Sequence, residues 1–328
     1  MSYVLGVDAG NTKTIAMVAR TDGTVVGAGR SGCGDIYGGE VAALDAIAAA
    51  SREALAQAQL PSTEMAAVVL SAAGADWPED FDTICDGAAD RGIGIAPVVY
   101  NDAIGGLRAG SPDGTGVGIV CGTGSATGAR SRDGRIWHSS FWQDPQGADQ
   151  LGEIVVKAIV RTELGVASPT PLTGAVLQYL RLPTVEAALH ALTARNLHSQ
   201  PLVKSLAKVL LDVAASGDEK SLAIITAHGR ALGDMALAAA RKVGIEIEHE
   251  SFHLVLTGGV LRHPSVLMRD AIVSRVREAA PNINVINDAM EPVFGAVMLA
   301  FEAANIGVTD EIKNRLRETS PDSSLFET

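Results

Sequence analysis

Cysteine is scarce in this sequence, and the few cysteines lie far apart. Cys33, Cys85 and Cys121 are the three that occur in 328 residues. An odd number of cysteines without close spacing excludes a disulfide framework and a zinc site built from CxxC pairs. The pattern is typical of a reducing compartment, and we therefore expect a cytoplasmic protein.

Positive charge is also in deficit. Lys and Arg total 26 against 38 Asp and Glu, which gives a formal net charge of −12. An acidic surface repels both the phosphate backbone of nucleic acids and anionic membranes. We therefore expect neither a nucleic acid nor a membrane among the partners.

Long apolar runs are absent, although 47% of the residues are hydrophobic. No stretch approaches the ~18 uninterrupted apolar residues of a membrane span. The first apolar run stops at Asp8, before the core of a signal peptide could form. With 35 glycines and 13 prolines, the composition is that of a globular protein with many tight turns. At ~150 residues per domain, the length predicts two domains.

Strand and helix signals alternate along the first hundred residues. Apolar runs of strand length are followed by apolar residues at helical spacing. We expect strands at 3–7, 14–19, 24–28, 66–70 and 96–100 and helices at 41–58 and 81–90. Such alternation predicts an α/β fold in which a β-meander is extended by parallel strands.

A second copy of the opening pattern begins near residue 116. The segment VLGVDAGNTKT at 4–14 is echoed by VGIVCGTGSAT at 117–127, and an Asp-Gly hairpin dipeptide follows each. We therefore predict two halves of one design. The second half is expected to add helices over 149–243, strands at 252–257 and 284–286, helices at 265–279 and 293–304, and a frayed tail over the last dozen residues.

Two glycine turns at equivalent places in the halves are candidate phosphate-binding sites. One consists of Gly10, Asn11, Thr12 and Lys13, and the other of Gly122, Thr123, Gly124 and Ser125. Glycine lets backbone N–H groups approach an anion closely, and a facing pair of turns suits the β- and γ-phosphates of a nucleotide. The Asp8 carboxylate could help to bind a magnesium ion at this site, or it could simply cap the hairpin. A Walker A loop is excluded, because the dipeptide Gly-Lys does not occur.

Two further strand ends carry candidate residues. Asp102 follows a predicted buried strand, where α/β enzymes place catalytic groups. It could act as general base toward a hydroxyl, or it could be a helix N-cap. Gly258, Gly259 and Val260 follow the strand at 252–257 and could lie against adenosine or form a plain turn.

Taken in order, these segments resemble the BadF-type ATPase and N-acetylglucosamine kinase family, within the superfamily of hexokinases, actin and the large heat-shock chaperones. The resemblance is carried by residues 7–14, 101–103, 122–125, 257–260 and 291–297. It implies an α/β fold of two ribonuclease-H-like, actin-like ATPase lobes around an interlobe nucleotide cleft. It also implies a sugar kinase that uses ATP and Mg²⁺ and often forms a homodimer.

The resemblance also assigns domains and roles. We expect an N-terminal lobe at 1–103, a larger C-terminal lobe at 104–295 with a helical insertion at 149–243, and a helix at 296–312 that packs back on the first lobe. The glycine turns would grip phosphates, and residues 258–260 would lie against adenosine. Asp8 would hold Mg²⁺ through water, and Asp102 would take the proton from the sugar hydroxyl.

The sugar-binding segments depart from the family pattern. Asp35 stands where family kinases that act on N-acetylglucosamine usually carry an Asn, and Trp142 and Asp149 lie in a second altered segment. Together with Asp102 and Thr123, these residues are expected to contact the substrate. Asp35 could favour the ammonium group of glucosamine over an acetamide by charge pairing. The alternative is that Asp35 caps a loop.

We predict an ATP-dependent kinase of an amino sugar, glucosamine or N-acetylglucosamine, or of a related hexose. Two other functions fit the same resemblance. An ATPase activator would hold an iron–sulfur cluster between subunits and would need solvent-facing cysteines, of which only Cys85 is expected to be free. A nonenzymatic, nucleotide-dependent regulator would keep the phosphate turns and lose the sugar pocket.

Overall fold

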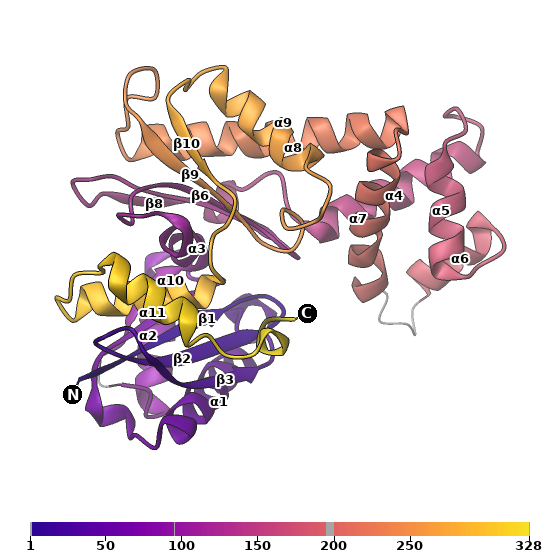
Figure 1. Cartoon of the computed structure of the whole chain (residues 1–328). Coiled ribbons are helices and arrows are strands. Elements are labelled where there is room, and N and C mark those ends of the chain that lie inside the picture. The colour runs from indigo at the N-terminus through magenta and orange to yellow at the C-terminus, as the bar shows by residue number, and fades with distance from the viewer. Residues whose placement is uncertain (1, 95, 195–199, 328) are drawn as a thin grey trace.

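The protein folds into two α/β lobes, each built on a five-stranded sheet (Figure 1). The computed structural model describes residues 2–94, 96–194 and 200–327. The strands of the first sheet are β1 (Tyr3–Ala9), β2 (Thr14–Arg20), β3 (Val25–Ser31), β4 (Met65–Ala72) and β5 (Val98–Asn101). Those of the second sheet are β6 (Gly116–Cys121), β7 (Ser125–Arg130), β8 (Ile136–His138), β9 (Phe252–Thr257) and β10 (Ile283–Ile286).

The two sheets have the same topology. Their strand orders are β3-β2-β1-β4-β5 and β8-β7-β6-β9-β10. The central strands β1 and β6 each pair antiparallel with the next strand and parallel with the strand on their other side. The predicted duplication is therefore confirmed. It places the β1–β2 turn and the β6–β7 turn at equivalent positions in the two lobes.

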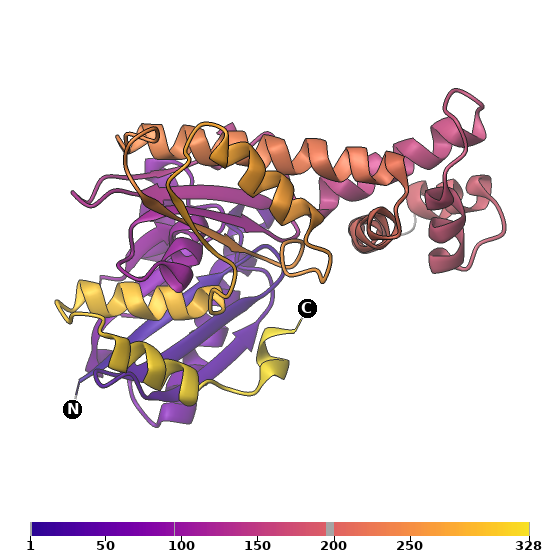
Figure 2. The ribbon, with the colours of Figure 1, turned by 45° about the horizontal axis from the view of Figure 1, so that its top comes forward.

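The helices predicted at 41–58, 81–90, 265–279 and 293–304 are found to within a few residues. The single helix expected over 296–312 was wrong, because the chain is not helical between Ala303 and Asp310, and the helix that starts at Asp102 was not predicted. The described residues form eleven α-helices. They are α1 (Glu40–Ala58), α2 (Pro78–Asp90), α3 (Asp102–Gly110), α4 (Ala148–Glu163), α5 (Pro171–Leu180), α6 (Val185–Thr193), α7 (Gln200–Ala215), α8 (Glu219–Lys242), α9 (Leu267–Arg277), α10 (Pro292–Ala303) and α11 (Asp310–Glu318). Helix α8 packs on the second sheet and on α9, whereas α4–α7 form an arm that projects from the second lobe (Figure 2). None of the described helices is long and apolar enough to cross a membrane.

Helices α10 and α3 join the lobes. Helix α10 packs against β1 and β4 of the first lobe and against α3, and α3 packs in turn against β6 and β7 of the second lobe. The approach is very close, because a Cβ atom at Gly295 would lie only 1.9 Å from the carbonyl oxygen of Gly105. A Cβ at Gly6 would lie 2.3 Å from the backbone nitrogen of Val297. Glycine is therefore required where α10 crosses its neighbours.

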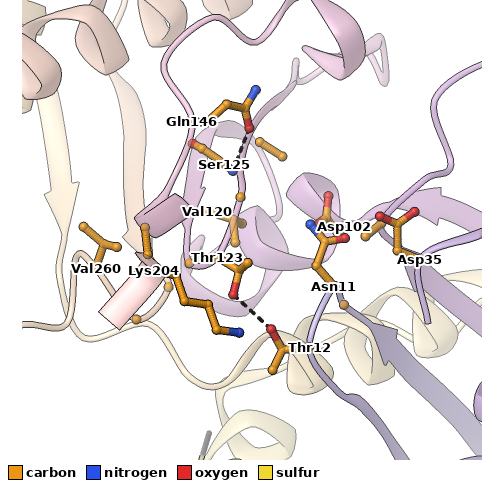
Figure 3. Close-up of a pocket in the computed structure, with 18 of the residues that line it drawn as sticks. Asn11, Thr12, Asp35, Asp102, Val120, Thr123, Ser125, Gln146, Lys204 and Val260 are labelled. Atoms are coloured by element: carbon orange, nitrogen blue, oxygen red, sulfur yellow. Dashed lines mark hydrogen bonds between the residues drawn. The ribbon is translucent and has the colours of Figure 1, made fainter. Parts of the chain in front are cut away.

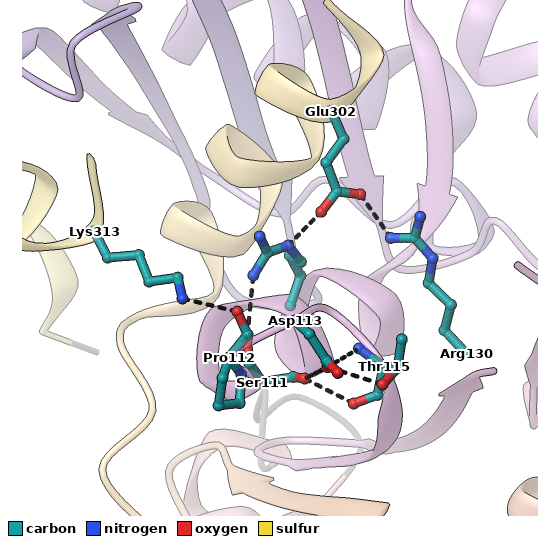
Figure 4. A network of polar contacts seen from close by, with 8 residues as sticks. Ser111, Pro112, Asp113, Thr115, Arg130, Glu302 and Lys313 are labelled. Atoms are coloured by element: carbon teal, nitrogen blue, oxygen red, sulfur yellow. Dashed lines mark hydrogen bonds and ion pairs between the residues drawn. The ribbon is translucent and has the colours of Figure 1, made fainter. Parts of the chain in front are cut away.

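A polar network ties the end of α10 to the second lobe (Figure 4). Glu302 accepts from Arg108 Nε and from Arg130 Nη1, each at 2.6 Å. Arg108 is only 3% exposed, and it also donates to the carbonyl oxygen of Ser111 at 3.1 Å. Burial lowers the pKa of Arg108, and the carboxylate of Glu302 opposes that effect. Glu302 thus compensates a cation buried between the lobes.

We expect Glu302→Gln to lower the free energy of unfolding by about 1–3 kcal/mol, because a nearly buried guanidinium loses its counter-charge. Glu302 itself is 28% exposed, which limits the loss. Glu278→Gln is the matched control, since Glu278 pairs with Arg230 on the exposed surface and should change stability little. Urea unfolding of both variants measures the difference, and equal small effects would contradict this role.

The C-terminal tail differs from the sequence prediction. The last dozen residues were expected to fray, but the chain continues through α11 into a short 3₁₀ helix, η4 (Ser323–Phe326). Leu325 and Phe326 pack on the apolar core around α10. Small polar residues made this segment look unanchored, whereas its two consecutive apolar side chains hold it on the first lobe.

Candidate active site

A cavity of about 960 Å³ opens between the lobes. It brings together both glycine turns, the two acids at the carboxyl ends of β1 and β5, and the loop after β9. The predicted site residues that line it are Asp8, Gly10, Asn11, Thr12, Lys13, Asp35, Asp102, Gly122, Thr123, Gly124, Ser125, Gly258, Gly259 and Val260. Residues from nearly the whole length of the chain therefore converge on one cleft.

The two glycine turns meet across the cleft. The hydroxyls of Thr12 and Thr123 are 2.9 Å apart and join the β1–β2 turn to the β6–β7 turn (Figure 3). Each turn is closed by a backbone hydrogen bond, from Gly10 N to Lys13 O at 3.0 Å and from Gly122 N to Gly124 O at 2.9 Å. The arrangement leaves small residues and hydroxyls facing a common space, which suits an anionic group such as a polyphosphate.

The start of α4 braces the second turn. Ala148 N donates to Gly122 O at 2.8 Å, and Asp149 N donates to Thr123 O at 3.1 Å. A Cβ atom at Gly147 would lie 2.2 Å from Gly124 O. The carbonyl oxygens of this turn are thus occupied by the first backbone N–H groups of α4.

Two of the predicted substrate residues lie outside the cavity lining. Asp149 meets the second glycine turn through its backbone, and its side chain stands in the first turn of α4. Trp142 is 71% exposed beside the cleft. Both positions are among the described residues, and neither contributes to the lining.

Asp102 stands at the first position of α3, where the chain leaves β5. Asn101, not Asp102, is the N-cap, because its Oδ1 accepts from Ala103 N at 3.1 Å. Asp102 is therefore not the N-cap of α3, and it lines the cavity. Burial, and then the negative charge of Asp76, raise the pKa of Asp102 to about 7. A carboxyl group with such a pKa can accept a proton near neutral pH.

Asp8 lies beside Asp102 at the end of β1. Burial, followed by the charges of Asp102 and Glu291, raises the pKa of Asp8 to about 7, and Lys13 and Arg262 oppose the rise. Among the described residues, no three His, Cys, Asp or Glu side chains are arranged to bind a metal by themselves. Mg²⁺ usually keeps several waters and binds through one or two carboxylates together with substrate phosphates. An incomplete set of carboxylates beside a space for phosphates therefore suits this ion.

Acidic and aromatic side chains surround the end of the cavity near Asp102. Asp35 Oδ1 accepts from Tyr37 N at 3.0 Å, so Asp35 caps a loop and also lines the cavity. Phe141 of the second lobe stacks on Trp77 with ring centroids 5.9 Å apart and meets Tyr37 edge-on at 5.3 Å. Because Tyr37 and Trp77 belong to the first lobe, this aromatic contact bridges the two lobes.

The opposite end of the cavity is lined by the loop after β9. Gly258 has a φ of 101°, and a Cβ atom there would lie 2.4 Å from the carbonyl oxygen of Cys121. A Cβ at Gly259 would meet no atom within 4 Å. Gly258 is therefore required by the backbone conformation of the loop. Gly259 borders open space, which a flat ligand could occupy.

Sequence reasoning missed one wall of this end, which α7 provides. Lys204, Ser205 and Lys208 of α7 line the cavity (Figure 3 labels Lys204). Lys204 and Lys208 are four residues apart and share a helix face, whereas Leu206 and Leu210 are fully buried. That amphipathic pattern predicted the helix, but it contained no sign that the polar face would meet the cleft.

An ion pair in the cleft was also missed. Arg262 Nη1 donates to Glu291 Oε1, and Arg262 Nη2 donates to Thr257 Oγ1 at 3.1 Å. Both charged residues line the cavity. Glu291 stands immediately before Pro292, at the start of α10, where the helix dipole stabilises a carboxylate, and this local pattern gave no sign of a partner in the cleft.

Comparison with known proteins gives consistent relationships. The chain matches the BadF/BadG/BcrA/BcrD ATPase family over residues 5–300. It is 26% identical to an N-acetyl-D-glucosamine kinase of Dictyostelium discoideum, over 91% of this chain and 98% of the relative. It is also 26% identical to an N-acetylmuramic acid/N-acetylglucosamine kinase of Clostridium acetobutylicum, over 92% of this chain and 98% of the relative.

Solved structures agree with the predicted fold. A proposed N-acetylglucosamine kinase from Chromobacterium violaceum superposes with a TM-score of 0.68 at 22% identity, over 92% of this chain and 99% of that one. A ROK family glucokinase from Streptomyces griseus, solved in complex with glucose and AMPPNP, superposes with a TM-score of 0.57 at 20% identity. The match covers 92% of this chain and 100% of that one. The predicted α/β fold of two actin-like ATPase lobes is thereby confirmed.

Proposed function

Because the chain belongs to the BadF/BadG/BcrA/BcrD ATPase family, we propose that it is an ATP-dependent kinase of an amino sugar. The observation that carries the proposal is the meeting of the two glycine turns, with Thr12 and Thr123 only 2.9 Å apart, in the cleft that Asp102 also lines. Phosphate-binding groups and a proton acceptor thus share one cavity. The two curated relatives, which are named amino sugar kinases, support the same assignment.

Asp102 is the proposed general base. The sugar hydroxyl oxygen attacks the γ-phosphorus, and its proton passes to the Asp102 carboxylate. A new oxygen–phosphorus bond forms while the bond from the γ-phosphorus to the β,γ-bridging oxygen breaks, which releases ADP. The two glycine turns would orient the phosphates and stabilise their charge through backbone N–H groups and hydroxyls.

Mg²⁺ is the proposed metal cofactor, and its chemistry when bound is to neutralise charge on the phosphates. Asp8 would hold it through water, with Glu291 nearby. Lys13 and Arg262 line the same part of the cavity and add positive charge around the phosphates. At the other end, the Gly258–Val260 loop and α7 would receive adenosine.

The reaction should depend on pH through Asp102. Since its pKa is raised to about 7, we expect kcat/KM to rise with pH and to reach its half-maximal value near pH 7, as the base loses its proton. A pH profile of kcat/KM from 5.5 to 8.5, at saturating ATP, measures this midpoint. A flat profile over that range would argue against Asp102 as the base.

The acceptor end favours a neutral or cationic amino sugar. Asp35, Asp76 and Asp102 all line it, and a carboxylate-rich pocket attracts an ammonium and repels an acid. We therefore expect kcat/KM for N-acetylmuramic acid, which carries a lactyl carboxylate, to be at least about tenfold below that for N-acetylglucosamine. We also expect glucosamine to be preferred over N-acetylglucosamine.

Steady-state kinetics on the three sugars test this prediction, with Asp35→Asn as the matched variant. Removing that charge should reduce the preference for glucosamine and leave the KM for ATP unchanged. Equal use of all three sugars by the natural chain would contradict the electrostatic argument. A broader screen of ADP release with amino sugars, neutral hexoses and polyols identifies the acceptor if none of the three is used.

We propose the lobe limits given by the resemblance, 1–103 and 104–295, with the helical insertion at 149–243, and we replace the single returning helix at 296–312 by α10 and α11. The end of β5 at Asn101 and the packing of α10 against β1 and β4 support them. A homodimer and a cytoplasmic location are further proposals, drawn from the family resemblance and from the cysteine pattern.

The two alternative functions have separate tests. The expectation that only Cys85 would be free was wrong, because Cys33 is exposed, whereas Cys85 is partly exposed and Cys121 is buried. An iron–sulfur activator would use the accessible thiols, and the purified protein would absorb visible light and contain iron. A nonenzymatic regulator would bind ATP but show no ADP release with any sugar.

A further inference from the structure

The C-terminal tail reaches the phosphate end of the cleft. The chain leaves α11 at Glu318 and runs along the first lobe to η4 (Figures 1 and 2). Phe326 lines the same cavity as the two glycine turns. The family match covers residues 5–300, so the tail lies outside the matched residues.

Lys13 is the residue that the tail contacts in the cleft. Its ammonium group donates to the backbone carbonyl oxygen of Phe326. An ammonium has three N–H donors, so one bond to a carbonyl leaves two for another acceptor. The contact therefore restrains the long, flexible side chain without consuming its capacity to bind an anion.

The tail is held on the first lobe independently of Lys13. Arg30 Nη1 donates to Ser324 O at 3.1 Å and to Leu325 O at 3.2 Å. The ring of Phe326 lies against that of Phe294, with centroids 6.1 Å apart. Asp322 Oδ1 accepts from Ser324 N at 2.9 Å and caps η4. These anchors fix the position of the Phe326 carbonyl before any ligand enters.

We infer that the C-terminal tail is a positioning element of the nucleotide site, which holds Lys13 toward the phosphates through the carbonyl of Phe326. The inference rests on the proposed function only in that the cleft binds a nucleotide. Restraining a lysine in its binding geometry lowers the entropy that must be lost when a phosphate binds. The tail should consequently strengthen binding of the triphosphate and have no effect on the nucleoside.

The test compares the natural chain with a variant that ends at Thr319. Calorimetric titration with AMPPNP, with no sugar present, should give a Kd about tenfold higher for the shortened chain, because Lys13 loses the hydrogen bond that restrains it and must be ordered when the phosphates bind. Titration with adenosine should give equal Kd values for both. A chain that ends at Glu327 is the control, since it keeps the peptide carbonyl of Phe326.

A double-mutant cycle shows whether the effect passes through Lys13. Lys13→Met should weaken AMPPNP binding, and shortening the tail in that background should cause no further loss. The full-length variant Arg30→Ala, which removes one anchor of the tail, should also weaken AMPPNP binding, but less than the truncation does. Thermal unfolding of each variant identifies any general loss of structure.

Several results would overturn the inference. Unchanged or tighter AMPPNP binding by the shortened chain would do so, and tighter binding would instead identify an inhibitory tail. If adenosine affinity falls as much as AMPPNP affinity, or if shortening the tail weakens AMPPNP binding further in the Lys13→Met variant, the tail has only a structural role. If the natural chain binds neither ligand, the proposed function fails as well. If the natural chain binds AMPPNP and the shortened chain binds it equally well, only the role of the tail is refuted.

Discussion

Asp102→Asn should lower kcat by about 10²–10⁴-fold while ATP binding persists, because a general base contributes a factor of that order. The amide has nearly the shape of the carboxyl group but cannot accept the hydroxyl proton. Asn101 caps α3 in place of Asp102, so the substitution leaves the helix N-terminus intact. Single-turnover phosphoryl transfer and nucleotide titration measure the two properties separately.

The same variant should be more stable than the natural chain at neutral pH. The pKa of Asp102 is raised to about 7 from a reference value of 3.8, so the folded protein binds this proton more tightly than the unfolded chain does. The stability it contributes is present below the unfolded pKa and is lost as pH rises through about 7. Asp102→Asn should therefore raise the Tm at pH 8 and change it little at pH 4. Near-normal turnover, or a lower Tm at pH 8, would contradict the assigned role.

Gly295→Ala should damage both stability and activity. A Cβ atom at this position would lie 1.9 Å from Gly105 O and 2.8 Å from Ala109 N, and two packed helices must separate to admit it. Overpacking of this kind costs about 1–3 kcal/mol or more. Because α3 begins with Asp102, displacing α3 from α10 also moves the candidate base. We expect a lower midpoint of urea unfolding together with a reduced kcat.

Gly174→Ala is the matched control for this substitution. Gly174 also lies inside a helix, α5, but a Cβ atom there would meet nothing within 4 Å. Alanine should stabilise that helix by about 0.5–1 kcal/mol and leave activity unchanged. Opposite shifts of the two unfolding midpoints would support the close crossing of α3 and α10, whereas a neutral Gly295→Ala would contradict it.

Local sequence patterns predicted the parts of the site that depend on strand ends and turns. The echo of 4–14 at 117–127 gave the duplicated topology, since each copy encodes a strand, a glycine turn and a second strand. A turn that follows a central strand must lie at the edge of its sheet, so the pairing of the glycine turns followed from the repeat. Asp102 was assigned to the site for a related reason, because it follows the carboxyl end of a parallel strand.

The remaining parts depend on how distant elements pack. Helix α7 lines the same cavity as the β9 loop, and nothing in its own amphipathic pattern indicates that neighbour. The tail was misjudged for the same reason. Its anchors, Arg30 and Phe294, are distant in sequence. Trp142 and Asp149 were chosen by position in a family segment, and such analogy does not specify which side chains face a cavity.

The most direct test of the central claim is to identify the product. The natural chain is incubated with ATP, Mg²⁺ and glucosamine or N-acetylglucosamine, and phosphorus NMR and mass spectrometry then follow the phosphate. The structure predicts a sugar phosphate formed in a one-to-one ratio with ADP by the natural chain and nearly none by Asp102→Asn. ADP and free phosphate without a phosphorylated sugar, or no ADP with any acceptor, would contradict the assignment.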